Sequence, residues 1–454
     1  MSPLTEVRAR VLTLLKKYGH NTTSFQILEP GLDYWFDGDD ACIGYCDTGG
    51  AWVVAGAPVA PVEREIEVFE RFLAAARAER RRVRFFCVEK DLSDELGLSH
   101  LHIGDQPVWD PGQWDDVLRS KRSLREQLRR ARAKGVLVRA VSPDELADTD
   151  TPIRQRIDEM IEHWMSSRAM APMGFVVHLD PYSLPEERRF YVAECDDRVV
   201  CILAAVPIYA REGWFFEDVL RDPAAPNGTI ELLFDHAMRD IHELGSQHVT
   251  FGLAPLAGTN HRVLRMIRDH SAWLYDFEGL RRFKAKLKPT TWDPVYMAYP
   301  TSERGIRATV DILAAFARGS FIKFGVQTLI HKAAAVTRVL ALLLIPWTVL
   351  LAFAPVEWFP TSEIQRAWLA LDCVLFGALM WLAARWRKPL AIALSMAAAT
   401  DFSLGVVQAV TYNAERADGF FDWTLIISAL AAPLFAAVFL WVSRDRERRY
   451  RVTS

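Results

Sequence analysis

The stretch FFEDVLRDPAAPNGTIELLF, residues 215–234, decides the fold of the part of the chain that precedes its long apolar blocks. Its beginning is typical of a strand near 213–219. The turn residues PNGT (226–229) and the apolar periodicity after them predict a helix over 229–243. The apolar stretch HVTFGLAP (248–255) then predicts another strand. A strand, a helix and a strand in this order indicate an α+β unit.

The residues before this stretch predict two units with a similar order of elements. The earlier part predicts a helix over 5–17, strands near 24–36, 41–46 and 51–55, a helix over 62–79 and a buried strand, VRFFCVE, at 83–89. A second unit is predicted to begin with a helix at 121–134, followed by a strand at 136–141, helices at 152–168 and strands near 174–178, 189–195, 198–208 and 213–219. The two units look like variants of one α/β plan.

Four long apolar blocks follow, at residues 337–356, 367–386, 389–411 and 423–443. Each has about the 20 residues that a helix needs to cross roughly 30 Å of hydrocarbon. The sequence therefore predicts four transmembrane helices. Asp372 and Asp401 lie inside the second and third, where a role in holding helices together is favoured over a lipid-headgroup or ion site.

Basic residues indicate the orientation of these helices. Arg385, Arg387 and Lys388 lie between the second and third blocks, and five arginines lie in RDRERRYR (444–451), after the fourth. Because cytoplasmic loops are enriched in Lys and Arg, both termini and the region before the blocks are expected in the cytoplasm. The protein is expected to be a multi-pass protein of the bacterial inner membrane.

Composition excludes several classes of protein. The 454 residues are 51% hydrophobic and 24% charged, so the chain is neither disordered nor fibrous. With 54 basic and 57 acidic residues the formal net charge is −3, which excludes a globally basic nucleic-acid coat. Six scattered cysteines without a CxxC pair argue against a zinc ribbon or a disulfide-stapled domain, and fit a reducing compartment.

Several motifs in a fixed order resemble one family. They are SLREQLRRARAKGV (123–136), MGFVV (173–177), FFEDVLRDPAAPNGTIELLF (215–234), VTFGLAPLAG (249–258) and LRRFKAKLKPTTWDPVYMAY (280–299). Together they resemble the cytoplasmic C-terminal domain of the bacterial multiple peptide resistance factor, phosphatidylglycerol lysyltransferase. The resemblance covers about residues 20–300.

This resemblance implies an α+β fold of tandem acetyltransferase-like (GNAT) units, followed here by the four-helix transmembrane region. The expected domains are an N-terminal GNAT-like unit (1–115), a C-terminal GNAT-like catalytic unit (116–303), an amphipathic juxtamembrane linker (304–336) and the transmembrane region with its basic tail (337–454). In the familiar lysyltransferases a large flippase-type membrane region precedes the catalytic domain. Here a smaller one follows it, so lipid flipping is not carried over.

The implied activity is transfer of an aminoacyl group from aminoacyl-tRNA to phosphatidylglycerol or a related lipid, which would reduce negative surface charge and resist cationic antimicrobial peptides. An aminoacyl ester is already activated, so neither a metal nor another cofactor is expected. The site must instead hold the ester beside the acceptor, remove a proton, stabilise the oxyanion and bind the ammonium group. Asp218 and Arg221 match the family's Asp…Arg pair. Asp218 could bind the ammonium or act as base, and Arg221 could hold a phosphate or steady the oxyanion.

The turn PNGT offers a second candidate site. Asn227 or Thr229 is expected to cap the helix that contains Glu231, and the free amides after Gly228 would bind an anion. This turn differs from the pyrophosphate loop with which ordinary acetyltransferases bind coenzyme A. The difference weakens an acyl-CoA reading without removing it.

Two basic stretches complete the candidate site. In RRFKAKLKP, read as a strand, Arg282, Lys284, Lys286 and Lys288 would share one face and bind lipid phosphate or the tRNA 3′ end. Lys284 is favoured because the family uses a lysine here. On the helix 121–134, Arg125 and Arg129 lie on a basic face with Arg122 and Arg132 that could contact the tRNA acceptor stem.

His163 could be a base near the site or a satisfied core residue. Pro172 and Met173 stand where the lysyltransferases tend to carry an acidic residue, so the sequence favours transfer of a different amino acid, a small or neutral one. Two other functions stay open: an acyl-CoA-dependent N-acyltransferase of GNAT type, and a non-catalytic membrane scaffold. A homo-oligomer also stays open.

Overall fold

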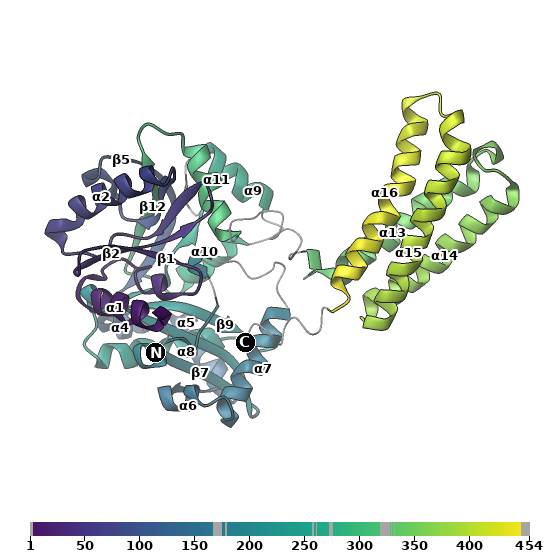
Figure 1. Ribbon diagram of the computed structural model, residues 1–454. Helices are drawn as coiled ribbons and strands as arrows, with labels where there is room; N and C mark the ends of the chain where they lie inside the picture. Colours follow the sequence, from purple (N-terminus) through teal and green to yellow (C-terminus); the bar gives the residue numbers. More distant parts are fainter. Residues whose placement is uncertain are drawn as a thin grey trace. The chain divides into compact units, whose positions relative to one another are not determined.

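The computed structural model describes residues 3–166, 175–177, 179–256, 258–259, 261–271, 276–317, 327, 329–330 and 332–445. Those up to Ala317 form one compact unit, here called the sheet unit. Those from Gln327 onward form a second, here called the helical unit (Figure 1).

The sheet unit alternates helices and strands along the whole of its length. Its N-terminal half contains α1 (Pro3–Tyr18), β1 (Asp33–Asp37), β2 (Ala41–Asp47), β3 (Ala51–Ala55), α2 (Glu65–Ala78), β4 (Arg82–Val88), α3 (Lys90–Glu95) and β5 (Leu98–Trp109). The C-terminal half contains α4 (Trp114–Ser120), α5 (Arg122–Ala133), β6 (Leu137–Val141), α6 (Pro143–Ala147), α7 (Pro152–Ser166), β7 (Arg189–Cys195), β8 (Arg198–Ile208), β9 (Gly213–Arg221), α8 (Thr229–Glu243), β10 (His248–Thr250), β11 (Ala254–Pro255), α9 (Arg262–Ser271), α10 (Phe277–Lys286), β12 (Thr291–Pro300) and α11 (Gly305–Phe316).

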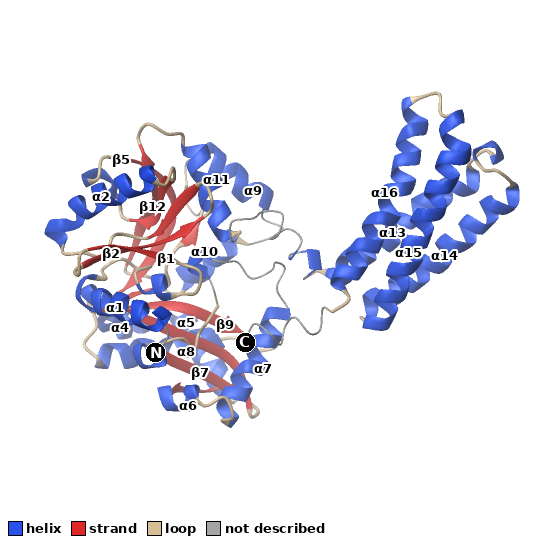
Figure 2. Ribbon diagram, in the orientation of Figure 1, coloured by secondary structure: helices blue, strands red, loops and turns tan. Residues whose placement is uncertain are grey.

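One mixed sheet runs through both halves, in the order β1-β2-β3-β4-β12-β5-β10-β9-β8-β7-β6, and β11 pairs with β5. In the N-terminal half, α2 lies between β3 and β4 in the sequence, and these two strands pair in parallel. In the C-terminal half, α8 lies between β9 and β10 in the same way, and these strands are also parallel. Helices lie over the strands of this sheet (Figure 2). This repeated arrangement agrees with the expected α+β fold of tandem units.

Two strands that the sequence did not predict join the halves. β12, which comes late in the chain, lies between β4 and β5, and β5 also pairs with β10. Irregular backbone hides both strands from a periodicity argument: the register shifts at Val295/Tyr296, and Gly104 has a φ of +146°. The C-terminal half therefore completes the sheet of the N-terminal half.

Two other predicted strands differ from the structure. The strand predicted near 24–36 is right only in its second part, since β1 covers Asp33–Asp37, whereas Phe25–Leu28 form a 3-10 turn, η1. The strand predicted near 174–178 is wrong, because its described residues form a second 3-10 turn, η4 (Phe175–Val177). Gln26 explains part of the difference, because its buried side chain donates a hydrogen bond from Nε2 to the Val176 carbonyl oxygen at 2.7 Å. This tertiary contact holds the two turns together and is not visible in either local sequence.

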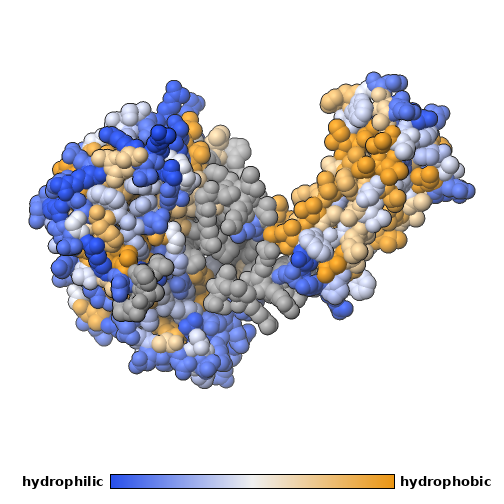
Figure 3. Space-filling model, viewed as in Figure 1, coloured by the Kyte–Doolittle hydropathy of each residue, from blue (hydrophilic) through white to orange (hydrophobic). Residues whose placement is uncertain are grey.

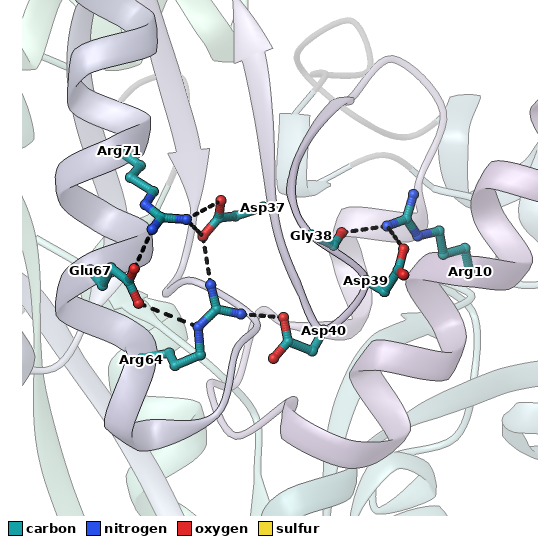
Figure 4. Close-up of polar contacts among 8 residues, drawn as sticks. All are labelled: Arg10, Asp37, Gly38, Asp39, Asp40, Arg64, Glu67 and Arg71. Atoms are coloured by element: carbon teal, nitrogen blue, oxygen red, sulfur yellow. Dashed lines mark hydrogen bonds and ion pairs between the residues drawn. The ribbon is translucent and has the colours of Figure 1, made fainter.

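An ion network holds the β1–β2 turn against α2 (Figure 4). Asp37 accepts hydrogen bonds from Arg64 at 2.8 Å and from Arg71 at 3.0 Å, and Arg64 also pairs with Asp40. On the other side of the turn, Arg10 of α1 pairs with Asp39 at 3.1 Å. Most of these groups are partly exposed, so the network chiefly positions the turn and adds little stability per pair.

The segment expected as a juxtamembrane linker, 304–336, begins with a helix that belongs to the sheet unit. Ala308, Ile312 and Ala315 of α11 are buried in that unit. Asp311 accepts hydrogen bonds from Arg82 and from the fully buried Arg84, both on β4. Residues 305–316 are therefore not part of a free linker. Residues 318–326 of the expected linker lie outside the described residues.

Among its described residues, the helical unit contains four helices that are long and apolar enough to cross a membrane. They are α13 (Ala333–Phe353), α14 (Ser362–Ala384), α15 (Lys388–Gln408, with its helical turns continuing to Arg416) and α16 (Phe420–Ser443). Their viewed surface is largely hydrophobic along its length (Figure 3). The chain is a membrane protein, as its apolar blocks predict.

Asp372 and Asp401, near the middle of α14 and α15, face the interior of the helical unit. Asp372 is 5% exposed and accepts a hydrogen bond from Thr348 of α13 at 3.4 Å, so it joins two helices, as the favoured interpretation expects. Asp372 and Asp401 both line a cavity of about 610 Å³ between the helices. Leucines from all four helices pack closely at the end of the bundle near Leu382 and Leu394.

Candidate active site

The candidate site lies where β9 extends beyond its partner β10. The two strands pair only from Gly213 to Phe215 of β9, opposite His248 to Thr250 of β10. Beyond Phe215, β9 continues to Arg221 with β8 as its partner. The second half of β9 is thus held on one side only, and its polar residues lie at this point.

A β-bulge sets the direction of the side chains on β9. Ala204 of β8 lies opposite Asp218, while the next residue, Ala205, lies opposite Phe216, so Glu217 is an extra residue on β9. A bulge of this kind redirects side chains that would otherwise alternate between the faces of the sheet. It allows the neighbouring residues Glu217 and Asp218 to approach the same group of charges.

Glu29, Arg188, Glu217 and Asp218 form this group, here called the acid cluster. Arg188 donates from Nη1 to Glu217 Oε2 at 2.5 Å, and both side chains are at most 5% exposed. Glu29, which follows η1 in the N-terminal half, is 4% exposed, and burial, followed by the negative charge of Glu217, raises its pKa to about 11.

The acid cluster carries more negative charge than its own groups neutralise. Among the residues that the structure describes, none donates a hydrogen bond to Glu29 Oε2, Glu217 Oε1 or Asp218 Oδ2, although all three atoms are shielded from solvent. Burial, reinforced by Glu217, raises the pKa of both Glu29 and Asp218. Three acidic groups with one arginine therefore need either bound protons or a cationic ligand.

Neighbouring turns enclose the acid cluster. Arg188 is held in place by Ser183, whose carbonyl oxygen accepts from Nε at 2.7 Å, and its guanidinium lies 5.3 Å from the ring centre of Phe25. Asp180 adds a further negative charge that acts on Asp218. The hydrogen bond from Gln26 to Val176 ties η4 to the turn that precedes Glu29. The positions of Pro172 and Met173 lie outside the described residues.

The structure separates Asp218 from Arg221, which the sequence analysis joined. Asp218 lies on the same side of β9 as the acid cluster. Arg221, three residues on, belongs to the opposite face and influences Cys201, which packs with α5 and α8. The guanidinium of Arg221 donates to the carbonyl oxygen of Ala225. It thus stabilises the loop before α8.

The PNGT turn packs tightly but is capped differently from the prediction. Gly228 is the N-cap residue of α8 and provides no side-chain cap, while the Thr229 hydroxyl donates back to the Pro226 carbonyl at 2.7 Å. Gly228 has a φ of +92°, and a Cβ there would lie 2.3 Å from the Gln127 carbonyl oxygen of α5. Asn227 is exposed and Glu231 is partly exposed on the first turn of α8.

The prediction that RRFKAKLKP forms a strand is wrong, because these residues lie in and just after the helix α10. Asp276 caps α10 by accepting from the Gly279 amide at 2.7 Å, and Leu280, Phe283 and Leu287 follow at helical spacing. Lys284 is buried, whereas Arg282 and Lys286 are exposed on another face. The expected row of four basic side chains therefore does not exist.

Lys284 stabilises the chain that leaves β10. Its ammonium group donates to the carbonyl oxygens of Phe251, Gly252 and Leu253 at 2.8–3.0 Å. Burial lowers the pKa of Lys284 to about 7. The contacts give Lys284 a positioning role beside the point where β9 and β10 part.

The other basic candidates are engaged within the protein. Arg125 donates to the carbonyl oxygens of Leu118 and Arg119 at the end of α4, and Arg129 pairs with Glu126 at 2.8 Å. His163 of α7 contacts Asp222 Oδ2 through Nδ1 at 2.8 Å. Asp222 follows β9 directly, so this pair lies at the end of β9 next to Arg221.

Sequence reasoning missed Glu29, Arg188 and Glu217. Glu217 lies in the motif that was quoted, but strand alternation places it opposite Asp218, and only the bulge overrides that rule. Glu29 comes from the other half of the sheet unit, and no local signal connects it with β9. Among the described residues no three His, Cys, Asp or Glu side chains are grouped as metal ligands.

The chain is similar to a known family of bacterial proteins. The family described as "Phosphatidylglycerol lysyltransferase, C-terminal" matches residues 12–299. The phosphatidylglycerol lysyltransferase of Bacillus subtilis is 25% identical over 305 residues, which are 64% of this chain and 35% of that protein. The lysylphosphatidylglycerol biosynthesis bifunctional protein LysX of Nocardia farcinica is 27% identical over 50% of this chain and 21% of its own length. The chain thus spans about a third or less of these relatives.

Two solved structures share the fold of the sheet unit. The C-terminal domain of a protein named as a lysylphosphatidylglycerol synthetase from Agrobacterium fabrum has a TM-score of 0.60 at 20% identity, covering 70% of this chain and 99% of that domain. The structure of L-PGS from Bacillus licheniformis has a TM-score of 0.59 at 20% identity, covering 68% of this chain and 96% of the other.

Proposed function

Since the chain belongs to the phosphatidylglycerol lysyltransferase C-terminal family, we propose that it is a membrane-bound aminoacyltransferase. It moves an aminoacyl group from aminoacyl-tRNA to phosphatidylglycerol or a closely related lipid. The donor ester is already activated, so the reaction exchanges one ester for another. The acceptor hydroxyl attacks the ester carbonyl and loses its proton, and the ribose oxygen of the tRNA leaves and takes up a proton.

The acid cluster is the observation that supports this function best. An aminoacyl group carries an ammonium group, and Glu29, Glu217 and Asp218 each present a solvent-shielded oxygen without a donor among the described residues. A bound ammonium would supply these hydrogen bonds and neutralise the excess charge. Asp218 lies at the bulge of β9, and it is the group that we expect to contact the substrate.

The charge of the acid cluster favours a cationic aminoacyl donor such as lysyl over a neutral one. The sequence analysis favoured a small or neutral amino acid from Pro172 and Met173. The cluster supports the opposite choice, because three carboxyl groups with one arginine can accommodate a second ammonium group. Aminoacyl-tRNA is made in the cytoplasm, and the basic flanks of the helical unit favour placing the sheet unit on that side of the membrane.

Lipid analysis tests the proposed function directly. Lipids extracted from cells with and without the full chain are compared by mass spectrometry, alongside Asp218→Asn and the matched exposed control Asp116→Asn. We expect an aminoacylated phosphatidylglycerol in cells with the wild type and with D116N, reduced at least about 100-fold by D218N. The mass of the adduct names the amino acid.

An unchanged lipid profile with normal membrane expression of the chain would contradict the function. Purified chain in vesicles then separates the alternatives, with charged tRNA and acetyl-CoA offered as competing donors. Transfer from acetyl-CoA alone would support the N-acyltransferase, and no transfer from either donor would support the scaffold.

A further inference from the structure

The outer face of α11 is apolar although it belongs to the sheet unit. Ile306, Val310 and Leu313 are 59%, 49% and 41% exposed. Residues three and four apart share one side of a helix, so the three side chains form a stripe, here called the outer stripe. Arg304 and Arg307 are exposed beside it, whereas Asp311, the one acidic residue of α11, is 6% exposed. The exposed face of a surface helix is normally polar.

The opposite face of α11 fixes the direction of the outer stripe. Asp311 accepts hydrogen bonds from Arg82 at 2.7 Å and from Arg84 at 3.0 Å. The ring of Phe316 packs edge-on against Phe86 at 5.1 Å and Phe175 at 5.4 Å. With this face buried and ion-paired, the helix cannot rotate to hide the outer stripe inside the protein.

We propose that the outer stripe of α11 inserts into the interfacial layer of a bilayer that contains anionic lipids, and so docks the sheet unit on the membrane. Continuity of the chain supports a bilayer as the occupant: α11 ends at Phe316, and the first spanning helix begins at Ala333. The intervening residues reach at most about 60 Å when fully extended, so the chain keeps α11 within this distance of the first spanning helix.

Chemistry supports the same occupant. Apolar side chains flanked by arginines are typical of helices that lie in the interface of anionic membranes. Three side chains are also too few for a stable protein partner, which needs roughly 800 Å² on each side. Because Phe316 contacts Phe175 of η4, and η4 is bonded to Gln26 beside Glu29, docking would hold the acid cluster in a fixed orientation relative to the lipid surface.

Photocrosslinking tests the docking of α11. A photoreactive phenylalanine analogue replaces Val310 in the full chain, which is reconstituted in vesicles of phosphatidylglycerol and phosphatidylcholine. The matched control is Val62, a valine of the N-terminal half that is 80% exposed. We expect lipid adducts at position 310 to exceed those at position 62 about tenfold, and to fall several-fold in phosphatidylcholine alone.

Equal lipid labelling at positions 310 and 62 would overturn the proposal, as would adducts at 310 that join two copies of the chain. Equal labelling at position 310 with and without anionic lipid would show that Arg304 and Arg307 do not contribute to docking through anionic headgroups. This readout needs no aminoacyl transfer, so its failure is distinct from failure of the proposed function. As a second measurement, Val310→Asp should lower transfer to vesicle lipid about fivefold or more and spare detergent-dispersed lipid, whereas Val62→Asp should change neither.

Discussion

Two buried carboxyl groups of the acid cluster lower the stability of the sheet unit at neutral pH. Glu29 and Asp218 are carboxyl groups whose pKa is raised, first by burial and then by the neighbouring Glu217. A group with a raised pKa favours the folded state below its unfolded pKa and opposes it as pH rises toward the folded pKa. Such groups persist where binding needs them, at the expense of stability.

The substitution Glu29→Gln should therefore stabilise the protein at alkaline pH while weakening transfer. The unfolded chain releases the Glu29 proton above about pH 4.3, whereas the folded chain retains it, so rising pH favours unfolding of the wild type only. The gap in stability between E29Q and wild type should shrink by up to about 1.4 kcal/mol per pH unit from pH 8 to pH 5.5. Thermal melting across this range measures it.

Exposed Glu63→Gln is the control for this prediction, and its gap from the wild type should stay flat over the same pH range. A gap for E29Q that stays flat between pH 8 and pH 5.5 would show that Glu29 is ionised in the folded protein.

Lys284 should behave as a positioning residue. Lys284→Met leaves the carbonyl groups of residues 251–253 without their donor, at a cost of about 2–4 kcal/mol in the free energy of unfolding. Lys286→Met, two residues on and exposed, should change stability by less than about 0.5 kcal/mol. Melting temperature and transfer rate are measured together, and a K284M variant that melts like the wild type but has lost all transfer would instead make Lys284 a catalytic residue.

At the scale of elements, the contact between α5 and α8 depends on one glycine. The N-terminus of α8 approaches α5 so closely that Gly228 has no room for a side chain. This approach brings the loop that follows β9 over the basic helix. Gly228 of PNGT thus serves packing, and the predicted side-chain cap is absent from the described α8, whereas the predicted anion binding stays a prediction.

Gly228→Ala should destabilise the chain by about 3 kcal/mol or more, because it combines a left-handed backbone with a Cβ 2.3 Å from the Gln127 carbonyl oxygen. Gly135→Ala isolates the backbone contribution: Gly135 has a φ of +77° with nothing within 4 Å, so about 1 kcal/mol is expected. Thermal unfolding of both variants tests the difference, and equal losses would argue against the steric contact.

At the scale of the whole molecule, the helical unit anchors the chain, and charge at its ends indicates the orientation. Arg385, Arg387 and Lys388 lie between α14 and α15, while the α13–α14 connection carries Glu357 and Glu363. These flanks predict that both termini lie on the cytoplasmic side.

Reporter fusions check this orientation in living cells. Green fluorescent protein fused after Ser454 should fluoresce, because it folds in the cytoplasm, and alkaline phosphatase fused within the α13–α14 connection should be active, because it needs the periplasm. The reverse pattern would place the sheet unit outside the cell and would remove its access to aminoacyl-tRNA.

The sequence by itself determined the properties that depend on local order. Apolar periodicity predicted α5, α7 and α8 nearly to their ends, apolar length predicted the four spanning helices, and the order of motifs predicted the family. Asp218 is a candidate residue from the sequence because it lies in the motif that decides the fold, and its role stays a prediction.

Only the tertiary structure decided which residues surround Asp218. Glu29 reaches it from the other half of the sheet unit, Glu217 turns toward it through a bulge, and Arg221 and Lys284 serve neighbouring backbone instead. These outcomes depend on strand register and on contacts between segments distant in the sequence, which periodicity cannot encode. The burial that follows from those contacts gives the carboxyl groups their raised pKa, and the same burial shows that α11 belongs to the sheet unit.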